Sequence, residues 1–556
     1  MNFDYIVVGG GSGGCVLAAR LSEDPAVSVA LIEAGPVDKS ILIHVPAGLA
    51  LLAQTKTANW NFNTVPQKGL NGRIGWQPRG KVLGGSSSVN AMVYIRGHRA
   101  DYDHWAAEGN EGWSYDEVLP YFRRAEHNER ITNEYHGNAG PLNVMDLRSP
   151  NKYLQAFVDA GREAGFPVTD DFNGAEQEGI GPYQVTHKNG ERFSAAKAYL
   201  TPNLGRKNLT VFTEAHTTRI LFEGKRATGV EFRRAGRLEQ IGANHEVLMA
   251  AGALQTPQIL MLSGVGAAAD LAKHGIGVVH DLPGVGRNLH DHVDATQVVE
   301  APLLKETFGV TPGGIARVLK AIPEWRNKRS GILTTNFAEA GGFIKSQASE
   351  DIPDLQLHFV IAKLVDHGRK TVLGHGYSIH ACVLRPQSRG SVTLASADPF
   401  AAPLIDPNFF DHPDDMQRMV RGFRLMRDIV KQPALARLGG REHARSANAT
   451  TDAEIEQFIR NYADTIYHPV GTCRMGNGAL DVVGADLRIH GLEGIRVVDA
   501  SMMPRIIGGN TNAPTIMVAE KASDMIKAAR LAGAGSTPQT VQAVADAKVP
   551  PIELAA

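Results

Sequence analysis

Grouped cysteines, a net charge and long apolar runs are what this sequence lacks. Its three cysteines lie far apart without metal-ligand spacing, so we expect no metal site and a reducing compartment. The 57 basic and 58 acidic residues nearly cancel, which argues against a broad surface for nucleic acid. No run of about 18 apolar residues occurs, so we expect no membrane-spanning helix.

Only two residues precede the first predicted strand. An apolar, β-branched run begins at Phe3, so we expect no cleavable signal peptide and a cytoplasmic protein. The composition, with 43% hydrophobic residues, is ordinary for a globular protein. At 556 residues the chain is too long for one small core, so two domains are expected.

The first 33 residues are the most informative stretch. Phe3–Val8 reads as a buried parallel strand, Val16–Leu21 as a helix, and Val27–Ile32 as a second strand ending in Glu33. Between strand and helix the spacing is G-x-G-x-x-G, at Gly9, Gly11 and Gly14. Such glycines allow a tight turn, close approach of a pyrophosphate and packing of helix on strand. A carboxylate about 20 residues further on can accept from a ribose hydroxyl. The pattern predicts a bound ADP moiety, with a purely structural turn as the alternative.

A second glycine-rich turn lies within Arg79–Trp105. It contains Gly84, Gly85, Ser86 and Ser87. Small residues let a backbone lie flat against a planar ring, where free N–H groups can reach carbonyl oxygens or ring nitrogens. By composition alone, a flexible loop is the simpler interpretation.

The rest of the chain alternates between predicted helices, turns and strands. Residues 115–170 read as amphipathic helices, and Thr256–Leu262 as a helix entered through Pro257. The next glycine run, from Gly264, follows a helix and therefore reads as a turn rather than a second site for NAD. Predicted strands are Thr210–Phe222, Thr228–Phe232, His245–Ala251, Asp354–Val360, Tyr377–Leu384, Ser391–Leu394 and Ile495–Val498.

Two late stretches carry candidate chemistry: Tyr467–Met475 and Gly508–Lys521. His468 precedes a proline, which disfavours helix there, and histidine is the natural proton acceptor near neutral pH. Asn512 lies in a Gly/Asn turn just before a predicted helix, which Asn510 or Asn512 can also cap. With 20 histidines in the chain, a structural role for His468 is the simpler interpretation from chemistry alone.

Several long motifs in the same order carry a resemblance to a known family. They are IVVGGGSGGCVLAARL with LIEAG, RGKVLGGSSSVNAMVYIRG, AGALQTPQILMLSGVG, LPGVGRNLHDH, and YHPVGTCRM followed by IRVVDASMMPRIIGGNTNAPTIMVAEK. From Asp4 to about Met525 the chain resembles the glucose–methanol–choline (GMC) oxidoreductases, which use FAD. NAMVYIRGH, QVTHKNGERFSAAKAYL and YHPVGTCRMG are most similar to bacterial alcohol dehydrogenases for primary aliphatic alcohols, and choline dehydrogenase-like proteins share the longer motifs.

The resemblance implies an α/β (α+β overall) fold, with a Rossmann-type FAD-binding domain and a smaller antiparallel-sheet substrate domain. We expect residues 1–300 in the FAD-binding domain, with substrate-side helices inserted at about 115–170. Residues 301–469 then form the substrate-binding domain, 470–530 return to the FAD-binding domain, and 531–556 form a mobile tail.

The resemblance also implies site residues. Positions matching the family's FAD-binding motifs are Gly9, Gly11, Ser12, Gly13, Gly14, Glu33, Ala34, Gly84, Gly85, Ser86, Ser87, Asn90, Ala91, Met92, Val93, Thr217, Asp499, Ala500, Asn510 and Thr511. His468 matches the family's catalytic histidine, and Asn512 matches that histidine's partner residue. Some relatives tether the flavin through a histidine where Ser88 and Val89 stand here, so noncovalent FAD is expected.

The implied reaction is oxidation of a primary alcohol to an aldehyde. A hydride leaves the alcohol carbon for flavin N5 while His468 takes or orients the hydroxyl proton and Asn512 holds the oxygen. The alternatives are an oxidase that uses O₂, a choline dehydrogenase in which Glu339 supplies charge, and a non-redox hydroxynitrile lyase. A binding or scaffold protein is the remote last alternative.

Partners follow from the same reading. We expect a small alcohol substrate, a quinone-type electron acceptor and no nucleic acid, and the oligomeric state stays open. A quinone favours peripheral contact with the inner membrane. The sequence shows no strongly basic amphipathic helix to make that contact.

Overall fold

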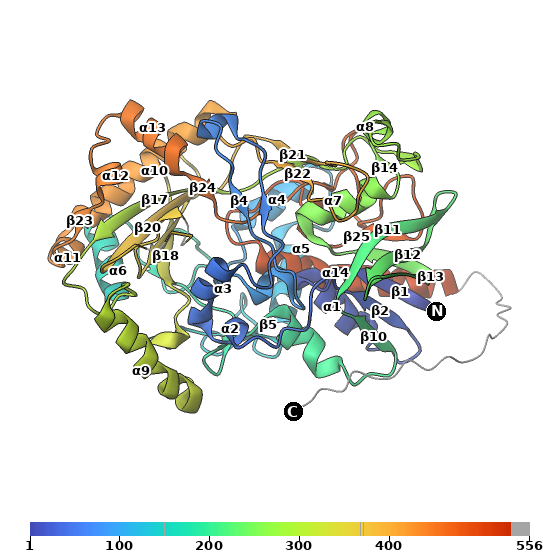
Figure 1. The fold of residues 1–556 in the computed structure, drawn as a ribbon, viewed down its shortest axis with the longest axis horizontal. Coiled ribbons are helices and arrows are strands. Elements are labelled where there is room, and N and C mark those ends of the chain that lie inside the picture. Colours follow the sequence, from blue (N-terminus) through green and yellow to red (C-terminus); the bar gives the residue numbers. More distant parts are fainter. Residues whose placement is uncertain (150, 367–368, 371, 535–556) are drawn as a thin grey trace.

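The computed structural model describes residues 1–534, except residues 150, 367–368 and 371. Its first sheet has the strand order β10-β2-β1-β13-β12-β11, with β25 paired to β13 (Figure 1). The strands β10, β2, β1, β13 and β25 are parallel, and β11 and β12 add an antiparallel edge. Their bounds are β1 (Asn2–Val8), β2 (Val29–Ile32), β10 (Leu209–Phe212), β11 (Ala215–Glu223), β12 (Arg226–Arg234), β13 (Arg237–Met249) and β25 (Ile495–Val497).

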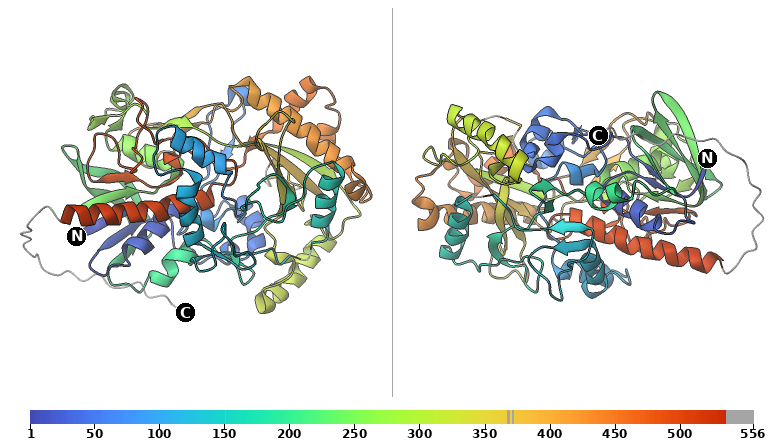
Figure 2. Two further views of the ribbon diagram at one scale, coloured as in Figure 1. Left: turned by 180° about the vertical axis from the view of Figure 1, so that it is seen from behind. Right: turned by 90° about the horizontal axis from the view of Figure 1, so that it is seen from below.

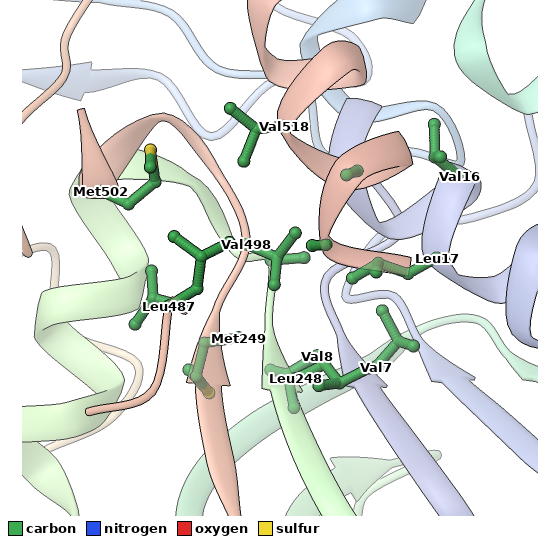
Figure 3. Close-up of a cluster of buried hydrophobic side chains, with 14 of the residues drawn as sticks. Val7, Val8, Val16, Leu17, Leu248, Met249, Leu487, Val498, Met502 and Val518 are labelled. Atoms are coloured by element: carbon green, nitrogen blue, oxygen red, sulfur yellow. The ribbon is translucent and has the colours of Figure 1, made fainter. Parts of the chain in front are cut away.

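Two helices from opposite ends of the chain pack on this sheet. α1 (Ser12–Leu21) lies along α14 (Asn512–Ala534), the red helix in Figure 2, and α5 (Tyr115–Ala125) packs on α14. Figure 3 shows their shared core, where Val8 and Leu17 meet Val498 and Val518. The C-terminal segment therefore packs with the first sheet through β25 and α14.

The second sheet is antiparallel, in the order β23-β17-β20-β19-β18-β7, with β24 on β17. One face packs on helices and the other borders a cavity, so side chains alternate: Phe359 is in the helix-side core and His358 and Val360 line the cavity. Bounds are β7 (Gly179–Pro182), β17 (Val293–Glu300), β18 (Ala338–Ile344), β19 (Leu355–Val360), β20 (Gly376–Val383), β23 (Arg441–Glu442) and β24 (Asp464–Thr465), and the helices are α6 (Tyr153–Glu163), α10 (Pro413–Lys431), α11 (Pro433–Ala436) and α13 (Asp452–Tyr462).

The remaining elements connect and cover the two sheets. They are α2 (Ile41–His44), α3 (Leu49–Thr55), β3 (Phe62–Asn63), β4 (Trp76–Gln77), α4 (Arg99–Ala107), β5 (Glu126–Asn128), β6 (Leu142–Val144), β8 (His187–Lys188), β9 (Glu191–Arg192), α7 (Gly252–Leu262), β14 (Val265–Gly266), α8 (Ala268–Lys273), β15 (His280–Asp281), β16 (Arg287–Leu289), α9 (Pro312–Lys328), β21 (Gly390–Thr393), β22 (Leu404–Asp406) and α12 (Ala444–Ala447). Among the described residues, no helix has the length and hydropathy needed to cross a bilayer.

The predicted mixed α/β fold is confirmed, and two element predictions need correction. Thr210–Phe222 forms two strands, because the chain leaves the parallel sheet at Glu214, which has a φ of 53°. α7 begins at Gly252, so Pro257 lies inside the helix. A proline there leaves the carbonyl of Ala253 without its helical donor. The Thr472 hydroxyl donates to that carbonyl at 2.6 Å, so the helix tolerates the proline.

Domain limits remain a proposal. We propose residues 1–300 and 470–530 as the FAD-binding part and 301–469 as the substrate-binding part. β7 and β17 lie within residues 1–300 but pair with strands of the antiparallel sheet. Of the helices within 115–170, α6 packs on that sheet whereas α5 packs on α14. The predicted tail begins inside α14, and its residues 535–556 lie outside the described part of the chain.

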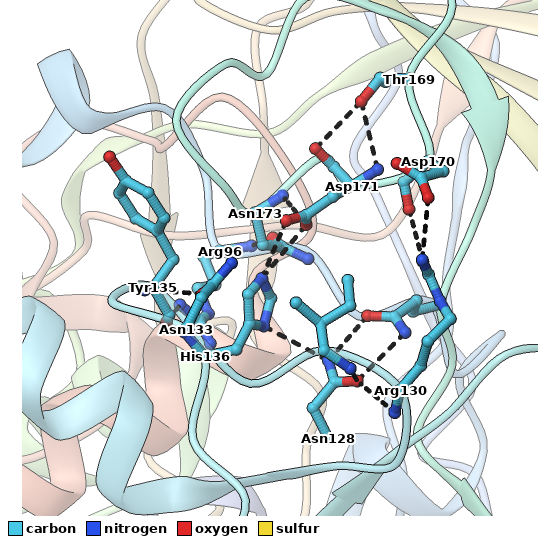
Figure 4. A network of polar contacts seen from close by, with 12 residues as sticks. Arg96, Asn128, Arg130, Asn133, Tyr135, His136, Thr169, Asp170, Asp171 and Asn173 are labelled. Atoms are coloured by element: carbon cyan, nitrogen blue, oxygen red, sulfur yellow. Dashed lines mark hydrogen bonds and ion pairs between the residues drawn. The ribbon is translucent and has the colours of Figure 1, made fainter.

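A buried ionic network joins several loops of the chain, and Figure 4 shows its contact between His136 and Asp171. Arg96 Nη2 lies 2.6 Å from Glu126, and His136 lies 3.0 Å from Glu126 and 3.1 Å from Asp171. Burial alone would raise the pKa of Glu126, but the adjacent Arg96 and His136 bring it below its ordinary value. Burial opposes protonation of His136, yet its hydrogen bonds to the two carboxylates raise its pKa. The ion pairs therefore hold together the chain segments around Arg96, Glu126 and Asp171.

Candidate functional site

The glycine turn after β1 is shaped by close backbone contacts. A Cβ at Gly14 would lie 1.8 Å from the Gly9 carbonyl oxygen, and a Cβ at Gly13 would lie 2.6 Å from that of Val498. Gly11 differs, because the nearest atom to its Cβ would be 3.9 Å away. Two of these glycines therefore allow α1 to pack, while Gly11 leaves open space at the helix N-terminus.

Glu33 follows β2 at the same edge of the sheet. Its carboxylate accepts N–H groups from Gly10 at 2.9 Å and Gly35 at 2.7 Å. Burial raises the pKa of Glu33 to about 7. Each oxygen keeps a further acceptor position, and Glu33 lines the cavity with Ala34, as a ribose-binding carboxylate requires.

The second glycine turn packs directly on the first. A Cβ at Gly85 would lie 2.7 Å from Gly11 Cα, and the Gly84 N–H donates to the Gly10 carbonyl at 2.8 Å. Ser87 is buried and accepts the Ala195 N–H, so its hydroxyl serves the fold. Among the predicted FAD-binding residues, those outside the cavity lining are Gly14, Gly84 and Ser87.

One cavity of about 1260 Å³ joins both glycine turns to the antiparallel sheet. This exceeds the roughly 300–1,000 Å³ of an ordinary small-molecule site, so a dinucleotide and a substrate fit together. Thr217, Asp499 and Ala500 also line this cavity. The Asp499 carboxylate, however, is occupied by the Gly252 N–H, the Thr256 hydroxyl and Ser501, and therefore caps α7.

His468 is held in place through its own backbone. Its N–H donates to Asp291 Oδ1 at 2.8 Å, and Asp291 Oδ2 accepts from Thr465 at 2.5 Å and Gln77 at 2.9 Å. The preceding Tyr467 has a φ of 75°, a conformation that non-glycine residues rarely adopt. Several side chains together hold this turn and thus fix where the imidazole lies.

The imidazole of His468 contacts two polar neighbours. His468 Nδ1 lies 3.0 Å from His292 Nδ1, and His468 Nε2 lies 3.2 Å from Asn510 Nδ2. Burial lowers the pKa of His468 well below its ordinary value, and nearby His292, His358 and Arg79 lower it further. Burial lowers the pKa of His292 to about 4. Both rings are therefore neutral near pH 7.

The predicted pairing of His468 with Asn512 needs correction. Asn512 is the first residue of α14, and its Oδ1 accepts from the Ser12 hydroxyl at 2.7 Å. Asn510, assigned above to the cofactor, is the asparagine beside His468. The loop before it is anchored at Gly508, whose N–H donates to Asp101 at 2.7 Å. The start of α14 and the anchored loop before it thus give two asparagines that look equivalent in sequence different neighbours.

Two further residues were missed. Gln356 in β19 donates to Asn510 Oδ1 at 3.1 Å, and the Nε2 atom of His292 lies 3.0 Å from the Leu384 carbonyl oxygen. His292 stands in the quoted motif LPGVGRNLHDH, so that motif is the signal for it. Gln356 gives no local signal, because only the sheet brings it near Asn510.

The substrate end of the cavity is mostly apolar. Its wall includes Val93, Phe337, Val360 and Ile466, with His380 beside Asp294 at 2.7 Å. Among the described lining residues, the carboxylates are Glu33 and Asp499, both at the nucleotide end. Glu339 is buried in β18 outside the lining and bonds to Thr335. No cluster of metal-ligating side chains occurs in the described part of the chain.

Comparison with known proteins decides the family. Two GMC oxidoreductase models match residues 3–294 and 386–519. The chain belongs to the GMC oxidoreductase family. It is therefore a flavoprotein oxidoreductase that acts on CH–OH groups, with FAD as the cofactor of the family.

Individual relatives cover almost the whole chain. An alcohol dehydrogenase [acceptor] of Pseudomonas putida is 50% identical, covering 94% of this chain and 95% of its own. A mitochondrial choline dehydrogenase of Homo sapiens is 44% identical, over 94% and 90%. The structure of pyridoxine 4-oxidase from Mesorbium loti superposes with a TM-score of 0.84 at 32% identity, over 94% and 99%.

Proposed function

We propose that this GMC oxidoreductase oxidises a primary aliphatic alcohol to the aldehyde, with noncovalent FAD and a quinone-type electron acceptor. His468 is the proposed base, and Asn510 is its proposed partner. The observation that carries the proposal is a chain of hydrogen bonds from Leu384 to Leu357, which fixes the protons on both side chains.

One end of this chain sets the tautomer of His468. The Leu384 carbonyl only accepts, so the Nε2 atom of His292 is the donor there. His292 is neutral, which makes its Nδ1 an acceptor for the Nδ1–H of His468. The Nε2 atom of His468 then carries a lone pair, as a proton acceptor requires.

The other end sets the amide of Asn510. The Tyr183 hydroxyl donates to the Leu357 carbonyl at 2.6 Å, so its oxygen accepts from Gln356 Nε2. Gln356 also donates to Asn510 Oδ1, which turns the NH₂ group of Asn510 toward His468. A donor and an acceptor thus lie side by side at the cavity wall.

This pair suits a hydroxyl group. An alcohol that enters between them accepts the Asn510 N–H and donates its O–H to His468 Nε2, which takes the proton as the aldehyde forms. FAD, when bound, supplies the hydride acceptor for the alcohol carbon. The low pKa of His468 keeps the imidazole in its basic form before the substrate arrives.

The rest of the wall supports an aliphatic substrate. Val93, Phe337, Val360 and Ile466 offer apolar contacts to an alkyl chain, and among the described lining residues no carboxylate lies beside them to pair with a quaternary ammonium. For noncovalent binding, the Ser88 hydroxyl donates to the Leu83 carbonyl at 2.7 Å, and Val89 has no nucleophile.

Anaerobic mixing of the yellow holoenzyme with 1-octanol, and separately with choline, tests the proposal. Bleaching of the flavin by octanol, with slow recovery in air and fast recovery with a soluble quinone, is the expected result. Fast recovery in air would instead indicate an oxidase. Bleaching by choline alone would indicate a choline dehydrogenase, and no bleaching by any alcohol would leave the lyase.

A further inference from the structure

Apolar side chains gather at the mouth of the cavity. Ile315, Leu319 and Ile322 of α9 line the rim and are 54%, 59% and 46% exposed. Leu51 of α3 and Ile41, which begins α2, line the opposite rim and are 49% and 58% exposed. These five residues are called the mouth surface below. Figures 1 and 2 both place α9 beside α2 and α3.

The exposed stripe is not a by-product of a loose helix. The inner face of α9 is anchored, because Ala321 and Trp325 are buried against Ala47 and the indole N–H donates to the Gly190 carbonyl at 2.8 Å. The stripe at positions 315, 319 and 322 follows helical spacing on the outer side. Contiguous exposed apolar surface of this kind marks an interaction site.

The polar positions of α9 are mostly basic. α9 carries Arg317, Lys320, Arg326 and Lys328 against Glu324 as its acidic residue. Arg326 continues the apolar stripe at helical spacing, and the other three basic residues lie on the far side of the helix from it. A helix with an apolar stripe and an excess of basic residues suits the boundary between the acyl chains and headgroups of an anionic bilayer. The sequence alone does not single out α9 as such a helix.

We propose that the mouth surface docks on an anionic lipid bilayer, with α9 lying in the headgroup region and the cavity opening toward the acyl chains. A second copy of the chain fits the surface less well, because a twofold contact through the stripe would bring Arg326 of both copies into one interface. Bilayer docking would let a lipophilic ligand enter the cavity without crossing water.

Vesicle binding tests this proposal separately from the proposed function, because it needs no turnover. The flavin-loaded full chain is sedimented with vesicles of phosphatidylcholine and phosphatidylglycerol. The variant Ile315→Ser/Leu319→Ser/Ile322→Ser should bind about a thousandfold more weakly, at roughly tenfold for each of the three lost apolar side chains. Flavin absorbance and thermal unfolding check that it is folded.

A matched variant controls for the loss of exposed apolar residues in general. Leu238→Ser/Val278→Ser/Leu480→Ser changes residues that are 64%, 48% and 50% exposed away from the mouth. It should bind as the unchanged protein does. Lys320→Glu/Lys328→Glu should weaken binding by roughly fivefold per charge, and only with vesicles that contain phosphatidylglycerol.

Three outcomes would overturn the proposal. They are no binding of the unchanged protein, equal loss in the matched variant, and binding that is unaffected by the α9 substitutions. Sedimentation without lipid tests the remaining alternative, which is that the mouth surface binds a second copy of the chain. A dimer that only the α9 variant dissociates would assign the surface to a second copy.

Discussion

The glycine turn and the cluster around His468 border the same cavity, and they are built differently. The turn uses neighbours in sequence: Gly9, Gly11, Gly14 and Glu33 fall within one strand–helix–strand unit. The cluster draws His292, Gln356, His468 and Asn510 from four distant segments, with Gln356 in β19 and the other three in loops. Backbone contacts shape the first, whereas a chain of side-chain hydrogen bonds shapes the second.

This contrast predicts different failures. A change in the glycine turn should act on folding and flavin retention, because its contacts are steric. A change in the cluster should act on turnover with the flavin retained, because its contacts set protons and orientation. The predictions below test that division.

Gly14→Ala should have the largest effect. Helix propensity alone favours alanine by about 1 kcal/mol, but its Cβ would lie 1.8 Å from the Gly9 carbonyl oxygen. We expect a loss of about 3 kcal/mol or more in unfolding free energy, together with loss of flavin. Thermal unfolding and visible absorbance measure both. A stable, yellow Gly14→Ala protein would show that steric fit does not control this turn.

His468→Ala should lower kcat by about 10²- to 10⁴-fold while the flavin absorbance stays unchanged. The reason is loss of the lone pair that receives the hydroxyl proton. Steady-state kinetics with an alcohol and a dye acceptor measure it. Full activity in this variant would remove His468 from the mechanism.

The two asparagines provide an internal comparison. Asn510→Ala removes the N–H beside His468 and should lower kcat/KM by about 10- to 100-fold, as expected for a buried hydrogen bond to a reacting group. Asn512→Ala breaks the contact with Ser12 and should weaken flavin retention while kcat of the loaded enzyme changes by less than about threefold. The reverse pattern would restore Asn512 as the catalytic partner.

His292 is a positioning residue in this account. His292→Ala leaves the Nδ1–H of His468 without its acceptor and should lower kcat by about tenfold. His292→Gln should recover much of that loss, because an amide can accept from His468 and donate to Leu384. Equal losses in both variants would mean that His292 only fills space.

The pH profile tests the same proton assignment. The pKa of His468 lies well below 6.5, so the neutral imidazole persists as pH falls through 6.5 and is lost only below its own pKa. The acidic limb of kcat/KM should therefore lie below pH 6.5. A limb at or above that value, absent in a His468 variant, would contradict a buried, neutral base.

The sequence predicts the parts built from local contacts better than the parts built from distant ones. Strand, glycines, helix and acid lie together along the chain, so the nucleotide turn can be recognised from local spacing. The mixed fold is recognised for the same reason. Gln356 cannot be found this way, because its neighbour Asn510 is brought to it only by the sheet.

Near-identical neighbours are a second limit. Asn510 and Asn512 stand two residues apart, and the start of α14 decides which one meets His468. The sequence rule for proline places the start of α7 at Pro257, five residues too late. The rule fails because Thr472, which supplies the missing donor, is distant in sequence. In both cases a remote contact overrides a local rule.

Both ends of the hydrogen-bonded chain are carbonyl oxygens, at Leu384 and Leu357. A backbone carbonyl accepts a hydrogen bond but does not pass a proton onward, so the chain is a dead end for proton transport. A proton taken by His468 must leave through the cavity by which the alcohol entered.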